Sequence, residues 1–195
     1  MKRILTTIAA TLLAFGVTAA QAAPEQYKLD TAHTFITFKT SHIGFSWMPG
    51  VFHDFSGTIT YDPEDRAASS TEFTVQTESV DTFHAERNKH LRERDGLFET
   101  GEFPTAKFVS TSYEPTGPDS AKLTGELTIK GNTHTVEFKV QELAARKDPW
   151  GNFRRAFSAS ATINLADFGL TYFADNNIPE PKTAEINISV EALRQ

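Results

Sequence analysis

Apolar and polar residues alternate with a period of two in one run after another along this chain, and this pattern constrains the fold more than any other feature. Between residues 122 and 129, for example, Leu123, Leu127 and Ile129 fall on one face. Successive side chains of a β-strand point to opposite faces, so each run predicts a strand with one buried face. The runs lie at residues 27–29, 33–43, 53–61, 71–80, 105–113, 122–129, 135–140, 157–165 and 186–190.

Short links rich in turn residues join these runs, and the pattern indicates about eight antiparallel strands. Gly131-Asn132 is the strongest hairpin signal, because it lies between two alternating runs. Such strands can form a barrel or a sandwich. We expect an all-β fold, an eight-stranded antiparallel barrel, because eight strands enclose room for one small ligand and one inserted helix can cap an end.

One segment, residues 81–98, has the period of an amphipathic helix. Asp81 or Thr82 can cap the free N–H groups at its start, and Gly96 suits the left-handed conformation that ends a helix. At 3.6 residues per turn, one face of this helix carries Phe83, Arg87, Leu91, Arg94 and Phe98.

Arg87 and Arg94 thus lie within an apolar stripe, where an unpaired buried charge is costly. In one interpretation they reach solvent or pair with Glu86, Glu93 or Asp95. In the other, they face the polar head group of a molecule held beneath the helix. The sequence leaves both interpretations open.

The first 22 residues have the pattern of a cleavable signal peptide. Lys2 and Arg3 precede an apolar run at residues 4–17, and Ala20-Gln21-Ala22 is a small-x-small cleavage signal. We therefore expect a periplasmic protein with a single domain at residues 23–195. The chain has no cysteine, so this domain must rely on its core and not on disulfides. The net charge of the whole chain, −6, argues against nucleic acid as a partner.

Phenylalanine is unusually frequent, with 16 copies against 2 Trp and 4 Tyr. So many large apolar side chains suit a wide interior, and an interior that they do not fill is a ligand pocket. Residues 44–52 combine turn formers with large apolar side chains, so we expect a loop that folds onto the barrel end or forms a portal. Phe45, Trp47 and Met48 in this loop are candidates for transient membrane contact without stable insertion. A homodimer is also left open.

The histidines do not indicate a metal or catalytic centre. Glu86 and His90 have i, i+4 spacing with His84 nearby, but no second pair has ligand spacing. The sequence has no cysteine, nucleophile elbow or glycine-rich phosphate loop, and paired carboxylates occur only in turns and on polar strand faces. We therefore expect no metal, no cofactor and no enzymatic activity.

Short motifs are spread over the whole chain that follows the signal peptide. They are Tyr27-Lys28-Leu29-Asp30, Ala32-His33, Ser41-His42-Ile43-Gly44, Phe52-His53-Asp54-Phe55-Ser56-Gly57-Thr58-Ile59-Thr60, Glu86-Arg87-Asn88-Lys89-His90-Leu91-Arg92, Phe103-Pro104-Thr105, Leu127-Thr128-Ile129-Lys130-Gly131, Asp148-Pro149-Trp150-Gly151 and Ile163-Asn164-Leu165-Ala166-Asp167-Phe168. In this order they resemble those of the YceI family, exported lipocalin-like proteins proposed to bind polyisoprenoids. The resemblance covers residues 27–190.

The resemblance implies a lipocalin-like barrel around an apolar cavity that holds a long-chain isoprenoid lipid, either a quinone or a polyprenyl phosphate, for transport or storage. Together with strand alternation, it assigns the tail cavity to Ile36, Phe38, Phe55, Leu127, Phe138 and Phe157, and the polar end to His42, Arg87, His90 and Arg92. One alternative is an enzyme that acts on the bound lipid by acid–base chemistry at His42 or His90. Another is a ligand-free interaction module in the cell envelope whose barrel is filled by its own side chains.

Overall fold

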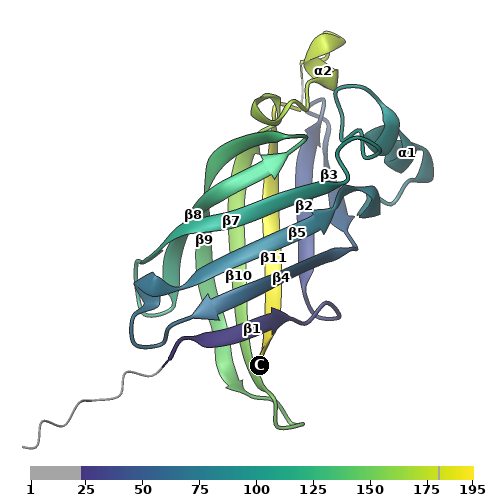
Figure 1. Cartoon of the computed structure of the whole chain (residues 1–195). Coiled ribbons are helices and arrows are strands. Elements are labelled where there is room, and N and C mark those ends of the chain that lie inside the picture. Colours follow the sequence, from purple (N-terminus) through teal and green to yellow (C-terminus); the bar gives the residue numbers. More distant parts are fainter. Residues whose placement is uncertain (1–22, 180) are drawn as a thin grey trace, which may run out of the picture.

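The computed structural model describes residues 23–179 and 181–195, and the expected signal peptide, residues 1–22, lies outside the described residues. Strands dominate the described chain (Figure 1). They are β1 (Glu25–Leu29), β2 (Phe35–His42), β3 (Ser46–Phe52), β4 (Phe55–Tyr61), β5 (Ser70–Gln76), β6 (Val80–Asp81), β7 (Thr105–Pro115), β8 (Ser120–Ile129), β9 (Asn132–Lys147), β10 (Phe153–Asn164) and β11 (Thr183–Arg194). The helices are α1 (Ala85–Glu93) and α2 (Tyr172–Asp175), with short 3₁₀ turns η1 (Arg66–Ala68), η2 (Thr77–Ser79) and η3 (Ala166–Phe168). No described helix is long and apolar enough to cross a membrane.

Eight of these strands form a closed antiparallel barrel, which confirms the fold expected from the alternation. Their order around the ring is β1-β4-β5-β7-β8-β9-β10-β11, and β11 returns to pair with β1. The closing pair joins Tyr27 to Arg194 and Leu29 to Ala192. Each strand of the ring therefore has a neighbour on both sides, and the ring leaves no full-length edge unpaired.

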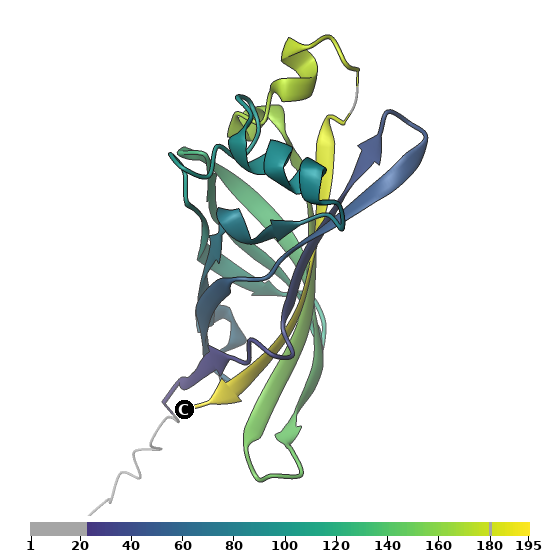
Figure 2. The same ribbon diagram turned by 90° about the vertical axis from the view of Figure 1, so that its right-hand side faces the viewer.

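The remaining strands, β2, β3 and β6, extend the sheet beyond the ring. β2 pairs with the part of β11 that β1 does not cover, where Ile36 lies opposite Ile188 and Thr40 opposite Ala184. β3 then pairs with β2, and β6 with β3. The hairpin formed by β2 and β3 projects past the body of the barrel at the end where both helices lie (Figure 2).

Residues 44–52 are therefore mostly strand, and the expected loop is wrong. Ser46–Phe52 forms β3, in a register that pairs Met48 with Thr40. Pro49 has no N–H and cannot take part in a ladder on both sides. It is tolerated because β6 pairs only with the last two residues of β3, so the outer side of Pro49 lies at a sheet edge of the described chain.

The helix is shorter than expected and begins at a different cap. Asp81 belongs to β6, and the N-cap is His84, whose Nδ1 accepts a hydrogen bond from the N–H of Arg87 at 3.2 Å. Gly96 is left-handed, with φ of 73°, but it lies in the turn after the helix has ended. Phe83 precedes the helix and is 71% exposed, so it is not part of the apolar stripe.

The buried side chain of Asn88 ties α1 to the residues that precede it. Its Oδ1 accepts hydrogen bonds from the N–H and the hydroxyl of Thr82 at 2.7 and 2.6 Å, and its Nδ2 donates to Asp81 at 2.8 Å. Asp81 and Thr82, expected as helix caps, thus bind a side chain of the helix and not its free backbone groups. These hydrogen bonds connect α1 to the end of β6.

Candidate ligand cavity

The barrel encloses a cavity of about 440 Å³. Small-molecule sites commonly measure roughly 300–1,000 Å³. Its wall consists mainly of Phe, Leu, Ile and Val side chains from the inward faces of the strands, as the period-two pattern requires. The described side chains therefore do not fill the barrel, in contrast to the filled-barrel alternative.

Two glycines help to keep the cavity open. The ring of Phe38 lies over Gly50, and the ring of Phe108 lies over Gly125. A Cβ atom on Gly50 would come within 2.2 Å of Cζ of Phe38, and one on Gly125 within 2.4 Å of Cζ of Phe108. Because both positions lack a Cβ, the two rings can lie against the barrel wall and leave its middle free.

Tyr61 lies at the end of β4, where it lines the cavity, and a buried ionic cluster lies behind its ring. The guanidinium of Arg155 stacks on the Tyr61 ring at 3.7 Å and donates to Glu142 at 2.7 Å and to Glu25 at 3.3 Å. Tyr61 lines the cavity, whereas Arg155 does not. Burial, aided by the Glu142 carboxylate, raises the pKa of the Tyr61 hydroxyl. A ligand at this end therefore meets a neutral phenol, with paired charges behind it.

The mouth of the cavity lies at α1 and α2. Arg94 donates to Oη of Tyr172 at 2.5 Å and to Nε2 of His90 at 2.9 Å, and the N–H of Tyr172 donates to the carbonyl of Gly96 at 3.0 Å. A guanidinium only donates, so Nε2 of His90 is the acceptor in its hydrogen bond with Arg94. Arg94, Tyr172 and His90 all line the cavity, and His42 lines it from β2. They are among the polar groups that a ligand meets at the mouth.

Arg87 also lines the cavity, close to the start of α1. Its Nε donates to the hydroxyl of Thr82 at 2.8 Å, and its Nη2 donates to the carbonyl of the same residue. Glu86 and Glu93, two of the acidic partners considered for the arginines, instead approach His90 and Lys89, each at 3.9 Å. Among the described residues, the contacts of both cavity-facing guanidinium groups are to uncharged acceptors.

Most residues expected at the site line the cavity: Ile36, Phe38, His42, Arg87, His90, Leu127, Phe138 and Phe157. Phe55 and Arg92 do not. Phe55 is buried among the core residues at the start of β4. Arg92 lies on the other side of α1, where it donates to the carbonyl of Val80 at 3.0 Å and approaches Glu78 at 3.5 Å. The helical period explains this, because residue 92 is turned away from the line through residues 87, 91 and 94.

Several lining residues are outside the set expected from the sequence. Met48 belongs to β3, the strand that resembled a loop. Ile186 lies on β11, where alternation does predict an inward side chain. Arg94 lies on the expected helical stripe, so the signal for it is present. Tyr172 and Phe173 come from α2, a single turn in a segment without periodicity, and no sequence signal identifies them.

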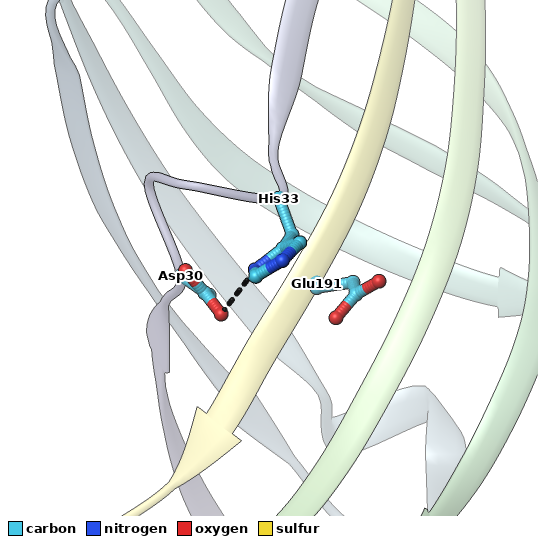
Figure 3. Close-up of side chains that lie close together, drawn as sticks. All are labelled: Asp30, His33 and Glu191. Atoms are coloured by element: carbon cyan, nitrogen blue, oxygen red, sulfur yellow. Dashed lines mark hydrogen bonds and ion pairs between the residues drawn. The ribbon is translucent and has the colours of Figure 1, made fainter. Parts of the chain in front are cut away.

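Outside the cavity, one cluster of described residues has the composition of a metal site. Asp30, His33 and Glu191 bring ligand atoms within 4.8 Å of one another (Figure 3). However, Nη1 of Arg154 lies 2.5 Å from Asp30 and 3.1 Å from Glu191, so a guanidinium already bridges the two carboxylates. The hydrogen bond from Arg154 lowers the pKa of Asp30 to about 2. We interpret the cluster as an ion-pair network that joins β1, β10 and β11.

Comparison with known proteins identifies relatives of the whole domain. The model of the YceI-like domain matches residues 27–192. A UPF0312 protein of Pseudomonas paraeruginosa is 43% identical over 192 residues, which cover 97% of this chain and 98% of that protein.

Solved structures show the same architecture. The Campylobacter jejuni YCEI protein has a TM-score of 0.71 and 29% identity, over 87% of this chain and 98% of that one. A polyisoprenoid binding domain from Saccharophagus degradans has a TM-score of 0.65 and 20% identity, again over 87% and 98%. The match extends over the entire barrel in both sequence and fold, and the chain belongs to the YceI family.

Proposed function

We propose that this protein binds a long-chain isoprenoid lipid, a quinone or a polyprenyl phosphate, in the barrel cavity and serves as its periplasmic carrier or reservoir. The observation that carries the proposal is the polarity of the cavity. Apolar walls lead from the neutral phenol of Tyr61 to a polar mouth at Arg94. A molecule with a long hydrocarbon tail and a polar head fits this arrangement. The Saccharophagus degradans domain of the same fold is described as polyisoprenoid binding.

Burial of the tail can drive the binding. Each carbon removed from water is worth roughly 0.8 kcal/mol, so one five-carbon isoprene unit contributes about 4 kcal/mol. Association costs roughly 4 to 15 kcal/mol in lost freedom, which about one to four buried units offset. The tail thus supplies affinity in the apolar barrel, and the head group determines selectivity at the mouth.

The mouth suits a head group that accepts hydrogen bonds. Arg87 and Arg94 face the cavity, and the partners described for both are uncharged. A phosphate would add the anion that these cations lack and would form charge-assisted hydrogen bonds with them. A quinone carbonyl needs only one donor. The contribution of the Arg94 charge therefore distinguishes the two head groups.

The periplasmic location rests on the signal-peptide pattern of residues 1–22. A carrier in that compartment shields the hydrocarbon tail of its ligand from water, which is the role of a closed apolar barrel. The sequence also leaves a homodimer open. Light scattering on the purified protein distinguishes a dimer from a monomer, and lipid binding in one barrel requires neither state.

The geometry does not favour acid–base catalysis as a second function. His42 and His90 both line the cavity, as such an enzyme would require. However, Nε2 of His90 accepts a hydrogen bond from Arg94 at 2.9 Å, and this bond would have to break before His90 could take a proton from a ligand. Lipid binding without turnover accounts for the apolar cavity and for the polar groups at its mouth.

A displacement titration tests the proposal. The protein is loaded with a fluorescent dye that emits in apolar surroundings, and a long-chain quinone or a polyprenyl phosphate is then added. We expect at least one of the two isoprenoids to displace the dye stoichiometrically, and more strongly than a saturated straight-chain alcohol of equal length. Displacement by neither isoprenoid would contradict the proposal, and so would displacement by the alcohol that is as strong as displacement by either isoprenoid.

A further inference from the structure

The hairpin between β2 and β3 ends in a tip, residues 43–47, that exposes large apolar side chains. Phe45 is 87% exposed, Trp47 66% and Ile43 43%. The hairpin projects beyond the barrel body, so these side chains lie at an outlying point of the molecule (Figure 2). Exposed aromatic residues gathered at one projecting point commonly mark an interaction site.

The hairpin tip is continuous with the mouth of the cavity. Ile43 belongs both to the tip and to the cavity lining, and its neighbours on the inward side of the hairpin, His42 and Met48, line the cavity as well. A tail that leaves the cavity along this wall therefore passes directly onto the apolar tip. The tip and the cavity wall are both apolar, so both can contact the hydrocarbon tail of a ligand.

A backbone conformation supports a role for a nearby aromatic residue. Phe83, which follows β6 next to β3, has φ of 63° and is 71% exposed. A bulky residue in the left-handed region is a true outlier, and such outliers cluster where function requires them. The hydrogen bond from the Phe83 N–H to Asp81 at 2.8 Å helps to hold this conformation. The sheet edge beside the hairpin thus also presents an exposed ring.

The free edge of β3 near the hairpin tip is poorly suited to pairing with a strand of another molecule. β6 pairs only with Val51 and Phe52, so the edge of β3 closer to the tip is unpaired in the described chain. Pro49 lies within that edge and has no N–H to offer, which opposes pairing with a strand of another protein or of a second copy. The apolar side chains of the tip, and not the backbone edge, are the feature to be matched.

The position of Lys39 matches the polar layer of a membrane. Its ammonium lies 5.3 Å from the centre of the Trp47 ring and 3.0 Å from the carboxylate of Glu185. Tryptophan is enriched at membrane interfaces, and lysine side chains reach from there to the phosphates. Trp47 at the tip therefore lies beside a cation, which also pairs with Glu185.

We infer that the hairpin tip docks on the surface of a phospholipid bilayer, with Phe45 and Trp47 inserted at head-group depth and the cavity mouth turned toward the lipid. Docking itself is independent of the cargo, but its purpose rests on the proposed function, because it would place the barrel where an isoprenoid can enter or leave. The contact is reversible and peripheral.

The two tryptophans of the chain provide an internal test. Trp47 lies at the tip, and Trp150, 80% exposed, lies in the turn between β9 and β10 at the opposite end of the barrel (Figure 2). Trp150→Phe leaves Trp47 as the only tryptophan, and Trp47→Phe leaves Trp150. Both proteins are mixed with vesicles of phosphatidylethanolamine and phosphatidylglycerol whose acyl chains are brominated or not.

We expect Trp47 emission to shift to shorter wavelength with vesicles and to be quenched by brominated chains, while Trp150 emission stays unchanged. Unchanged emission from both, or equal quenching of both, would overturn the inference. Phe45→Ser in the Trp150→Phe protein should reduce the partition coefficient at least tenfold. Unaltered partitioning of this variant would also overturn the inference.

The dye titration on the same proteins separates this inference from the proposed function. Phe45 does not line the cavity, so Phe45→Ser should bind isoprenoids in solution as well as the parent does, which also shows that it is folded. Protein that binds isoprenoids but ignores vesicles contradicts docking alone. Protein that docks but binds no isoprenoid contradicts the proposed function alone.

Discussion

Arg94 donates a hydrogen bond to the hydroxyl of Tyr172 at 2.5 Å, and this bond joins residues 78 positions apart in the chain. It connects the end of α1 with α2 at the mouth of the cavity, and Arg94 also donates to His90. All of these acceptors are uncharged. A guanidinium that faces an apolar cavity with neutral partners is the position at which an anionic head group would gain most.

Arg94→Met should therefore weaken binding of a polyprenyl phosphate by about tenfold to a hundredfold, because a hydrogen bond to a charged group is worth about 1.5–3 kcal/mol. Quinone binding should change much less, since a carbonyl carries no charge. Dye displacement with each isoprenoid measures both affinities.

Arg92→Met is the matched control, because Arg92 lies on the same helix but faces away from the cavity. It should leave both affinities unchanged. Equal losses of phosphate binding in the Arg92 and Arg94 variants would show that helix stability, and not the charge at the mouth, is responsible.

Ala159 lies on the inward face of β10, and its small side chain contributes to the space in the cavity. Ala159→Leu should lower isoprenoid affinity and shift preference to shorter tails, because the larger side chain takes volume that the tail would occupy. Because Ala159 also packs against core residues, the thermal unfolding midpoint is measured alongside binding, and it shows how far the larger side chain strains its neighbours. Titration with short and long polyprenols measures the preference.

Thr162→Leu provides the comparison, because Thr162 is an exposed residue of the same strand and does not line the cavity. This variant should bind like the parent. If Ala159→Leu retained full affinity for long tails, the tail could not lie along β10.

Asn88→Ala should destabilise the fold by about 1–3 kcal/mol, because it leaves the buried N–H of Thr82 without its acceptor. Urea unfolding measures the change in the free energy of unfolding. Lys89→Ala removes a neighbouring exposed side chain and should have little effect. A similar stability for both variants would mean that Asn88 does not anchor α1.

The barrel itself could be predicted from the sequence because alternation is local and each strand carries its own evidence. β3 could not, because Gly44, Pro49 and Gly50 have the signature of a turn. Only pairing with β2 on one side and a free edge on the other makes a strand acceptable at Pro49. The start of the helix was also predicted wrongly. The side chain of Asn88 binds Asp81 and Thr82, so these two residues do not cap the helix.

The cavity wall was predictable to the extent that alternation decides which side chains point inward, as for Ile36, Phe38 and Phe138. At the mouth, side chains converge from elements far apart in the chain. Helical periodicity indicates Arg94, but the position of Tyr172 depends on how α2 docks against Gly96, and no local pattern encodes that contact.

Acid stability should depend on Arg154. Its hydrogen bonds lower the pKa of both Asp30 and Asp148 from the ordinary 3.8 to about 2. Carboxyl groups with a lowered pKa stabilise the fold above about pH 4, and this contribution is lost as the pH falls toward about 2. Arg154→Met should therefore unfold at a higher pH than the parent, and the stability difference should shrink as pH 2 is approached.

Circular dichroism across an acid titration measures this transition. Arg146→Met, which removes an exposed arginine near the same turn, should leave the acid transition of the parent in place. If the Arg154 and Arg146 variants unfolded at the same pH, the ion-pair network at Asp30 would contribute nothing to acid stability.

The most direct measurement is native mass spectrometry of the protein purified from the periplasm, after expression with its own N-terminal segment, followed by extraction and identification of bound lipid. Binding in the barrel predicts a stoichiometric isoprenoid that is released on unfolding. Protein that carries no isoprenoid, and that takes up neither a quinone nor a polyprenyl phosphate when these are added, would contradict the assignment of the cavity as an isoprenoid site.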